Sequence, residues 1–179
     1  MLIQAGGNVG KLTKVLKLLL ITILIVMVTT LFSLVSGVLM IRNIHGNSMS
    51  TTLSNGDKVL ALTAFEPLQI KRGDIITFSG KGADKQTMIK RVIGLPNETV
   101  EIVDGNIFIN GKILQEDYIH IKYTQNVEMY DKMKLGKDEY FVMGDNRLVS
   151  MDSRSKEIGA VNRKDIIGVY LFKLIEIYK

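Results

Sequence analysis

The longest apolar stretch of the chain lies between Leu18 and Ile41, and it contains no charged residue and no proline. A transmembrane helix needs roughly 20 such residues, because each residue adds 1.5 Å and the hydrocarbon core is about 30 Å thick. The stretch is slightly longer than that, so its last residues are expected to leave the lipid. A buried helix of a soluble protein would carry a polar face, whereas this stretch has only scattered Thr and Ser. We therefore predict a transmembrane anchor at residues 18–41.

A cleavable signal peptide is the alternative interpretation of the same stretch. Its apolar region would span only about 7–15 residues, although Val35-Ser36-Gly37 resembles a small-residue cleavage site. Lys11, Lys14 and Lys17 precede the stretch, and no acidic residue lies before Asp57. Because positive flanks stay in the cytoplasm, residues 1–17 are predicted to form a cytoplasmic basic tail. Residues 42–179 then form an extracytoplasmic domain at the cell membrane.

Beyond the anchor, apolar residues alternate with polar ones in short runs rich in β-branched residues. Two of the connections, Asp104-Gly105-Asn106 and Asn110-Gly111, are strong hairpin signals. Residues 122–138 are polar and lack periodicity, which predicts a surface loop or a short helix. The whole pattern predicts a mainly β protein, in which a single N-terminal transmembrane helix precedes an all-β domain. The predicted strands cover 57–63, 74–79, 88–93, 99–103, 107–109, 112–114, 140–143 and 166–177.

Composition excludes several classes of chemistry. The chain has no cysteine, so it has no disulfide, no thiol nucleophile and no cysteine metal site. The two histidines, His45 and His120, are far apart and form no metal-binding motif. The net charge of +5 comes from basic residues interleaved with acidic ones rather than from a basic, aromatic stripe. We therefore expect no metal, no cofactor and no nucleic-acid partner.

The first segment with possible chemistry is Gly46-Asn47-Ser48-Met49. An extended chain covers at most ~3.5 Å per residue, so Ser48 lies within ~25 Å of the end of the anchor. A nucleophile there would act at the membrane surface. Gly46 and Asn47 allow a tight turn that directs N–H groups at an oxyanion. A serine beside Gly and Asn is, however, usually only part of a turn.

The second segment is the predicted strand Met88–Ile93, where alternation puts Met88, Lys90 and Val92 on one face. Burial disfavours the charged form of a lysine and lowers its pKa, by up to about 3–5 units when burial is complete. A neutral lysine amine can accept a proton from a serine hydroxyl. The alternative is a lysine at a sheet edge whose amine reaches water.

The third segment is the polar run Gly144-Asp145-Asn146-Arg147-Leu148-Val149-Ser150-Met151-Asp152-Ser153-Arg154. Two acids and two arginines in this spacing can pair and brace a loop, and its serines can orient a neighbouring amine. A solvated loop of turn residues is the alternative.

In this order, the three segments resemble the bacterial type I signal peptidases in their compact Gram-positive form. The matching motifs are Gly-x-Ser-Met, Lys-Arg-Val-Ile-Gly-Leu-Pro and Gly-Asp-Asn-Arg-x-x-Ser-x-Asp-Ser-Arg, and the likeness runs from the anchor almost to the C-terminus. The resemblance implies a serine endopeptidase with a Ser/Lys dyad, in which Ser48 is the nucleophile and Lys90 the general base. It implies that Ser150 hydrogen-bonds the lysine amine. It also implies an oxyanion hole built from the N–H of Ser48, with only backbone available at Gly46.

The resemblance further implies that Asp145, Arg147, Asp152 and Arg154 brace the loop that carries Ser150. The substrates would be signal peptides of secretory precursors, bound as an added strand against residues 44–46 and 87–89 and cut after small residues. The residues expected to form the substrate pocket are Ile44, Met49, Leu53 and Ile89.

The chain departs from the family's pattern at two loops. Thr51 stands where many members have proline, and Asn97-Glu98 stands where they have Gly-Asp. Eukaryotic-type relatives use a histidine base, but at the position that here holds Lys90, so His45 is expected to be a strand residue. Two other functions compete with a signal peptidase. One is a soluble self-cleaving Ser/Lys protease of the repressor type, and the other is an inactive, membrane-tethered binding module.

Overall fold

The structure, a computed structural model, describes residues 6–63, 68–81, 86–119 and 132–174. The chain divides into two compact units, Met1–Leu39 and Met40–Lys179, and each is described by itself.

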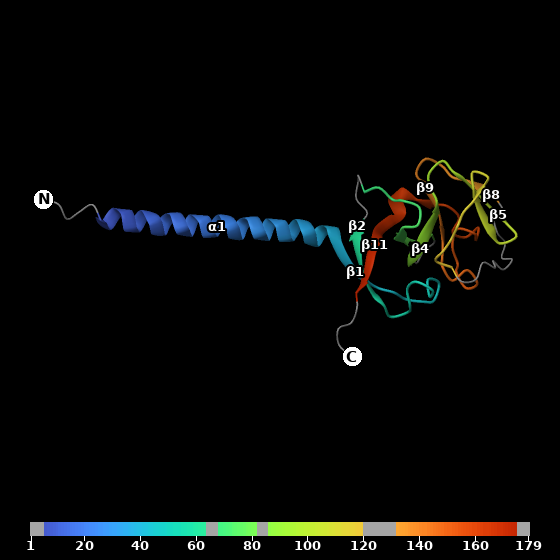
Figure 1. Cartoon of the computed structure of the whole chain (residues 1–179), viewed down its shortest axis with the longest axis horizontal. Helices are drawn as coiled ribbons and strands as arrows, with labels where there is room; N and C mark the ends of the chain where they lie inside the picture. The colour runs from blue at the N-terminus through green and yellow to red at the C-terminus, as the bar shows by residue number, and fades with distance from the viewer. Residues whose placement is uncertain (1–5, 64–67, 82–85, 120–131, 175–179) are drawn as a thin grey trace. The chain divides into compact units, whose positions relative to one another are not determined.

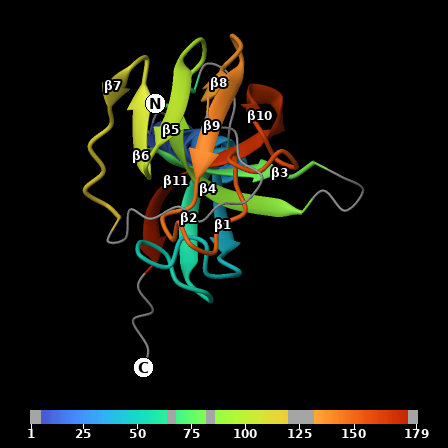
Figure 2. The same ribbon diagram turned by 90° about the vertical axis from the view of Figure 1, so that its right-hand side faces the viewer.

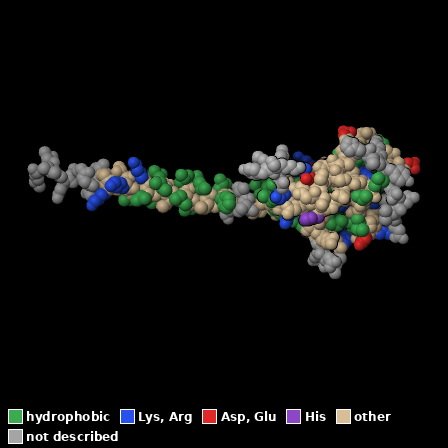
Figure 3. All heavy atoms as spheres, turned by 90° about the horizontal axis from the view of Figure 1, so that it is seen from below, with side chains coloured by type: hydrophobic (Ala, Val, Ile, Leu, Met, Phe, Trp, Pro, Cys, Tyr) green, Lys and Arg blue, Asp and Glu red, His purple; other side chains and the backbone are tan. Residues whose placement is uncertain are grey.

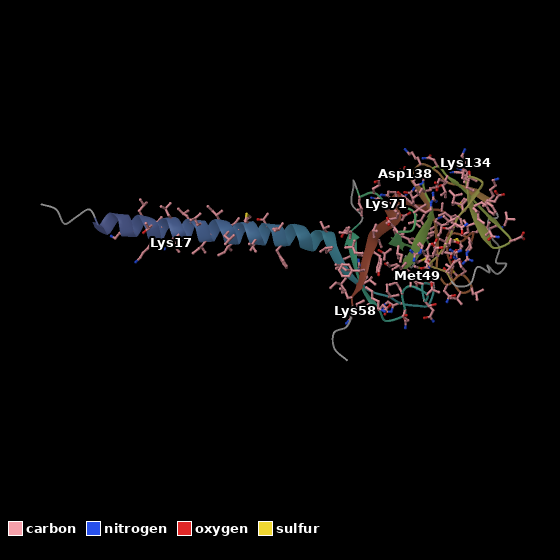
Figure 4. The ribbon with its side chains drawn as sticks, in the orientation of Figure 1. Lys17, Met49, Lys58, Lys71, Lys134 and Asp138 are labelled. Carbon is pink, nitrogen blue, oxygen red and sulfur yellow. The ribbon has the colours of Figure 1, made fainter. Side chains whose placement is uncertain are left out.

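The first unit is one continuous helix, α1 (Gly6–Val38) (Figure 1). Its segment Gly10–Phe32 has a mean hydropathy of 2.6, is not buried within the chain and is long enough to cross a membrane. Figure 3 shows basic side chains gathered toward the N-terminal end of this helix and apolar ones along the rest, and Lys17 projects from it in Figure 4. The hydroxyls of its threonines donate to carbonyl groups three or four residues earlier, which satisfies them inside the helix, as a lipid environment requires.

The helix does not have the bounds that the apolar pattern predicted for the anchor. It begins in the basic segment before Leu18, and residues 39–41 belong to the first strand instead. The helix therefore ends before the apolar stretch does, and the last residues of that stretch are extended.

Among the described residues, the regular secondary structure of the second unit is β-strand apart from one short 3₁₀ helix, in agreement with the mainly β prediction. In the described part of the chain, the larger sheet of this unit has seven strands in the order β1-β2-β11-β3-β4-β9-β10. Figure 2 labels each of these strands. The strand β4 lies between β3 and β9 and pairs antiparallel with both. A short 3₁₀ helix, η1 (Arg163–Asp165), leads into β11. The bounds of the seven strands are β1 (Leu39–Asn43), β2 (Lys58–Thr63), β3 (Ile75–Ser79), β4 (Thr87–Gly94), β9 (Glu139–Met143), β10 (Val161–Asn162) and β11 (Ile166–Leu174).

The smaller sheet has four strands in the order β7-β6-β5-β8. Both predicted hairpins are present, and the residue pairs Asp104-Gly105 and Asn110-Gly111 have positive φ angles between 49° and 78°. Such angles at both central residues are those of a type I′ turn, which Asn-Gly and Asp-Gly favour. The bounds are β5 (Thr99–Val103), β6 (Asn106–Ile109), β7 (Lys112–Ile113) and β8 (Lys132–Lys134).

The strand β8 corrects the prediction of a loop or short helix at residues 122–138. Residues 120–131, which include His120, lie outside the described residues, but Lys132–Lys134 pairs with β5. Within the strand only Met133 packs against the apolar core. Three residues with one inward side chain give too little alternation for a strand to be predicted.

The apolar core consists of three clusters of buried side chains, and β4 contributes to each of them. Val92 lies in the cluster under the central strands, and Ile93 lies in the cluster between the two sheets. Ile89 lies in a third cluster, beneath the turn that follows β1. Because its side chains are held in all three clusters, β4 is a fixed platform for Lys90, which lies between Ile89 and Arg91.

The end of β4 packs so closely that position 94 has room only for glycine. A methyl group at Gly94 would lie 2.5 Å from Val100 Cγ2 and 2.8 Å from Leu135 Cδ1. Overpacking costs about 1–3 kcal/mol, so we expect Gly94→Ala to lower the free energy of unfolding by that amount. Chemical denaturation of the full chain in detergent, followed by circular dichroism, measures the loss.

Gly136→Ala is the control for this prediction. The methyl group added there would meet only the carboxylate end of Glu139, at 3.1 Å, and that flexible side chain can move. Equal losses of stability in the two variants would contradict the packing argument.

Candidate active site

The turn that carries Ser48 is pinned at both of its ends. Ile44 N donates to Asp57 O at 2.8 Å, and Gly56 N donates to Ile44 O at 2.9 Å. Gly46 has a φ of 86°, which favours glycine, and its N–H donates to Asn55 Oδ1 at 2.9 Å. These bonds close the segment into a compact loop with Ser48 half-buried.

Apolar side chains also anchor this turn in the core. Met49, labelled in Figure 4, and Leu53 are each only 1% exposed, and both pack in the third core cluster with Ile89. Ser48 therefore stands on a turn whose next residue is held in the core.

The amine of Lys90 is buried beside this serine. The residue is 3% exposed and lies in the interior strand β4. Its Nζ donates to Ser48 Oγ at 2.7 Å and to Ile89 O at 3.0 Å. A lysine at a sheet edge whose amine reaches water is therefore not what the structure contains.

Burial lowers the pKa of Lys90 from 10.5 to about 8. The charge of Asp152 raises this pKa and that of Arg154 lowers it, both by less than burial does. A substantial share of the amines is then uncharged in mildly alkaline solution, which is the state in which an amine can accept a proton.

The next residue of β4, Arg91, forms a buried ion pair with Asp145. Arg91 donates from Nε to Asp145 Oδ1 at 2.8 Å and from NH2 to Asp145 Oδ2 at 2.6 Å. Asp145 also accepts the hydroxyl of Thr52. This single carboxylate therefore connects β4, the loop after β9 and the turn that carries Ser48.

The loop Gly144–Arg154 is internally braced and largely buried. Arg154 Nε donates to Asp152 Oδ1 at 2.8 Å, and Gly144 N donates to Asp152 Oδ2 at 3.0 Å. Arg154 NH2 also donates to Arg147 O at 2.9 Å. Asp145, Arg147, Asp152 and Arg154 are all at most 5% exposed, so a solvated loop of turn residues does not describe this segment.

Asn146 attaches this loop to the serine turn, and the sequence analysis did not select it. Its backbone N–H donates to Ser48 O at 3.0 Å. Its side-chain Nδ2 donates to Asn47 O at 3.2 Å and to Ser50 Oγ at 2.8 Å. An asparagine in a run of turn residues gives no local signal of such a role.

Ser150 lies in the site but does not make its predicted hydrogen bond to Lys90. Its Oγ is buried and has no hydrogen-bond partner within the described part of the chain. The hydrogen bonds from the lysine amine go to Ser48 and Ile89 instead. A methyl group at Gly144 would overlap both Ser150 Oγ and the carbonyl oxygen of Ser48, so the two serines meet at this glycine.

Of the two N–H groups predicted to donate to the oxyanion, one is already hydrogen-bonded within the described part of the chain and the other is not. The N–H of Gly46 is already bonded to Asn55, so it is not available to a substrate in this conformation. The N–H of Ser48 has no partner among the described residues. Ser48 N–H remains the predicted donor, and Gly46 is removed from that role.

A cleft of about 300 Å³ leads to the Ser48–Lys90 pair. Ile44 and Ile89 line it, as predicted, but Met49 and Leu53 do not, because they are buried in the core behind it. The exposed His45 also lines it. The full lining consists of Arg42, Asn43, Ile44, His45, Ser48, Thr77, Gln86, Thr87, Met88, Ile89 and Lys90.

The loop that departs from the family's pattern at Asn97-Glu98 closes through its own contacts. Asn97 has a φ of 67°, a left-handed conformation that asparagine tolerates. Glu98 accepts the N–H of Leu95 at 2.7 Å and pairs with Arg72 through both carboxylate oxygens. The substitutions therefore preserve an ordered turn after β4.

A buried lysine amine hydrogen-bonded to a serine hydroxyl, beside a cleft of about 300 Å³, is the arrangement expected in a serine hydrolase. A model of the family described as signal peptidase, peptidase S26, matches residues 12–175. The chain belongs to this family, which confirms the resemblance drawn from its motifs. The family and the apolar helix α1 together indicate a membrane-anchored protein.

The curated relatives agree with this assignment. Signal peptidase I P of Bacillus subtilis subsp. natto is 39% identical over 135 residues, which are 70% of this chain and 71% of the relative. Signal peptidase I V of Bacillus subtilis (strain 168) is 37% identical over 138 residues, which are 70% and 80% of the two chains. A crystal structure of a signal peptidase I from Enterococcus faecalis V583 is 37% identical, with a TM-score of 0.48, and covers 57% of this chain and 97% of its own.

The ion pair between Arg91 and Asp145 yields a stability prediction. Removing one partner of a buried pair leaves an uncompensated charge and costs about 3–5 kcal/mol. We expect Asp145→Ala to lower the free energy of unfolding by this amount in denaturant titrations.

Glu101→Ala serves as the control, because the pair of Glu101 with Lys132 is exposed and its ions are 3.5 Å apart. Its loss should cost less than about 1 kcal/mol. A loss in Asp145→Ala as small as that of the control would contradict the structural role of the buried pair.

Proposed function

We propose that this chain is a membrane-bound endopeptidase that removes signal peptides from exported precursor proteins, with Ser48 as nucleophile and Lys90 as general base. The observation that carries the proposal is the 2.7 Å hydrogen bond between the buried Lys90 amine and the Ser48 hydroxyl. The family of the chain, and relatives that are named signal peptidases, support the substrate.

In the proposed reaction, the neutral amine of Lys90 removes the proton from Ser48 Oγ while Oγ attacks the carbonyl carbon of the scissile bond. The N–H of Ser48 donates to the resulting oxyanion. When the C–N bond breaks, the lysine ammonium returns the proton to the leaving amine. A water molecule, deprotonated by the same lysine, then attacks the ester carbonyl, and the C–O bond to Ser48 breaks as the lysine ammonium returns the proton to Ser48 Oγ.

The hydroxyl of Ser150 has no hydrogen-bond partner among the described residues, which supports a role beside this lysine. A protonated lysine amine has three N–H donors. Two of them are used by Ser48 Oγ and Ile89 O, which leaves one for a further acceptor. Ser150 is proposed to accept from the ammonium form and so to hold its orientation between the two proton transfers. Asp145, Arg147, Asp152 and Arg154 keep the Ser150 loop in place.

The cleft supports binding of an extended peptide. Residues 42–45 and 86–89 line it, so a substrate strand between them would gain main-chain hydrogen bonds. Ile44 and Ile89 line the cleft with Ser48, and we propose that these apolar side chains admit only small side chains ahead of the cut. The partners proposed for this protein are accordingly signal peptides of secretory precursors.

The anchor is proposed to place this reaction at the outer face of the cell membrane. Lys11, Lys14 and Lys17 precede the apolar part of the helix, and such charges stay in the cytoplasm. Residues 42–179 would then be extracellular, and the lipid bilayer is a second partner. No nucleic-acid partner is proposed.

Substitutions at the proposed dyad test the mechanism directly. In detergent, with a secretory precursor as substrate, Ser48→Ala and Lys90→Ala should each lose cleavage nearly completely, because one variant lacks the attacking hydroxyl and the other lacks the amine that contacts it. His45→Ala should retain much of the activity, since His45 is exposed and the amine contacts Ser48 instead.

Gel analysis of precursor and mature protein measures the outcome. Loss of cleavage in His45→Ala with retention in Lys90→Ala would reverse the assignment. A wild-type chain that cleaves no precursor would favour the inactive, membrane-tethered binding module.

The pKa of Lys90 predicts a pH dependence with a definite sign. Only the neutral amine is a base, and its pKa is lowered to about 8 by burial. We expect kcat/KM to rise about tenfold per pH unit below that value and to level off above it. A profile measured from about pH 6 to about pH 10 tests this. A rate that falls as the pH rises through 8 would contradict a lysine base.

A further inference from the structure

A buried ion pair joins Arg147, in the loop Gly144–Arg154, to Glu116, which lies outside the three motifs. Arg147 NH1 donates to Glu116 Oε2 at 3.0 Å, and NH2 donates to Glu116 Oε1. The side chain of Arg147 is 0% exposed and that of Glu116 only 6%. Glu116 comes from the segment after β7, far from the loop in sequence, and it supplies the only carboxylate that pairs with Arg147 among the described residues.

Tyr118, from the same segment, contacts a second buried arginine. Its ring lies 4.0 Å from the guanidinium carbon of Arg91, which is a cation–π distance. Its hydroxyl donates to Glu116 Oε1 at 2.6 Å. Burial, and then the hydrogen bond and charge of Glu116, raise the pKa of Tyr118, so the hydroxyl stays protonated and remains a donor.

A short series of contacts connects each of these arginines to the proposed Ser48–Lys90 dyad. Arg147 Nε donates to Gly144 O at 3.2 Å, and Gly144 adjoins both the carbonyl of Ser48 and the hydroxyl of Ser150. Arg91 follows Lys90 in β4 and binds Asp145, which accepts the hydroxyl of Thr52 on the serine turn.

We infer that Glu116 and Tyr118 are positioning residues for the reaction of Ser48 with Lys90. They hold the two buried arginines, and the arginines hold the Gly144 loop and the serine turn at the separation that the proton transfer needs. The inference rests on the proposed function and deepens it, because it assigns a role to a segment that contacts neither reacting group.

The physical reason is the cost of an unpaired buried charge. Without the Glu116 carboxylate, Arg147 would have to move toward water, and it would take the carbonyl of Gly144 with it. A shift of this kind alters the contact between the loop and Ser48. A displacement of about 1 Å at a reacting pair can lower a rate on the order of 10²-fold.

The test compares two variants that each remove the charge of a carboxylate bonded to an arginine through both oxygens. Glu116→Gln removes it beside the site, and Glu98→Gln removes it from the pair with Arg72, which contacts neither the loop nor the serine turn. Full-length proteins in detergent are compared for kcat and KM on one precursor, below the melting temperature of each variant.

We expect Glu116→Gln to lower kcat on the order of 10²-fold with KM changed less than about threefold. Glu98→Gln should keep kcat within about threefold of the wild type, even if its melting temperature falls equally. Equal kcat values for the two variants at equal folded fractions would overturn the inference, because Glu116 would then only stabilise the fold.

Two further variants test the inference if the Glu116→Gln protein does not fold. Tyr118→Phe keeps the ring over Arg91 and the Glu116–Arg147 pair but removes one hydrogen bond, and it should lower kcat about 3- to 10-fold. An unchanged kcat there would overturn the role of Tyr118. The double variant Glu116→Gln/Arg147→Gln should be no slower than Arg147→Gln alone if Glu116 acts through Arg147, and additive losses would contradict that route.

Labelling of Ser48 by a serine-directed fluorophosphonate provides a readout that needs no peptide substrate. If the wild type is labelled but cleaves no precursor, the proposed function fails, and slower labelling of Glu116→Gln than of Glu98→Gln still supports the positioning role. Equal labelling rates overturn it. A wild type that is neither cleaving nor labelled overturns both proposals.

Discussion

The chemistry of this protein depends on one costly arrangement, an amine taken out of water and set against a serine hydroxyl. Desolvation penalises the charged form of Lys90, and the same penalty makes the amine a base. This penalty would drive the Lys90 amine toward solvent if the surrounding strand could move. It cannot, because β4 is an interior strand whose neighbouring side chains are held in three separate core clusters.

The charges around the amine are arranged so that they do not undo this effect. Asp152 would favour the ammonium, but it is bonded to Arg154, and the two charges act on Lys90 in opposite directions. Asp145 is likewise paired with Arg91. Buried acids therefore brace the site without restoring the ordinary basicity of the lysine. The pairing of these charges explains why a segment with so many charged residues can border a buried lysine amine whose pKa is still lowered.

Local patterns predicted the elements of the fold well and the contacts between them poorly. The apolar helix, the hairpins at Asp104-Gly105 and Asn110-Gly111 and the strand of Lys90 all follow from periodicity and turn chemistry, which act over a few residues. The motif resemblance brought Ser48 and Lys90 together, and the structure joins them across 42 positions. No short-range rule shows that Met49 and Leu53 pack behind the cleft, or that the N–H of Gly46 is used by Asn55. Asn146, Glu116 and Tyr118 were missed for the same reason, since each acts through residues that only the tertiary fold brings near.

The attachment of β4 to all three core clusters also governs how the site moves. Opening the strand would expose apolar surface in every cluster at once, so its amide protons should exchange with solvent only through the rarest and most global fluctuations. The serine turn packs in the third cluster only, and its other attachments are hydrogen bonds such as those with Asn146 and Asp145, so its amides should exchange at a lower free-energy cost. We therefore expect the distance between Ser48 Oγ and Lys90 Nζ to vary more through motion of the serine turn than through motion of β4.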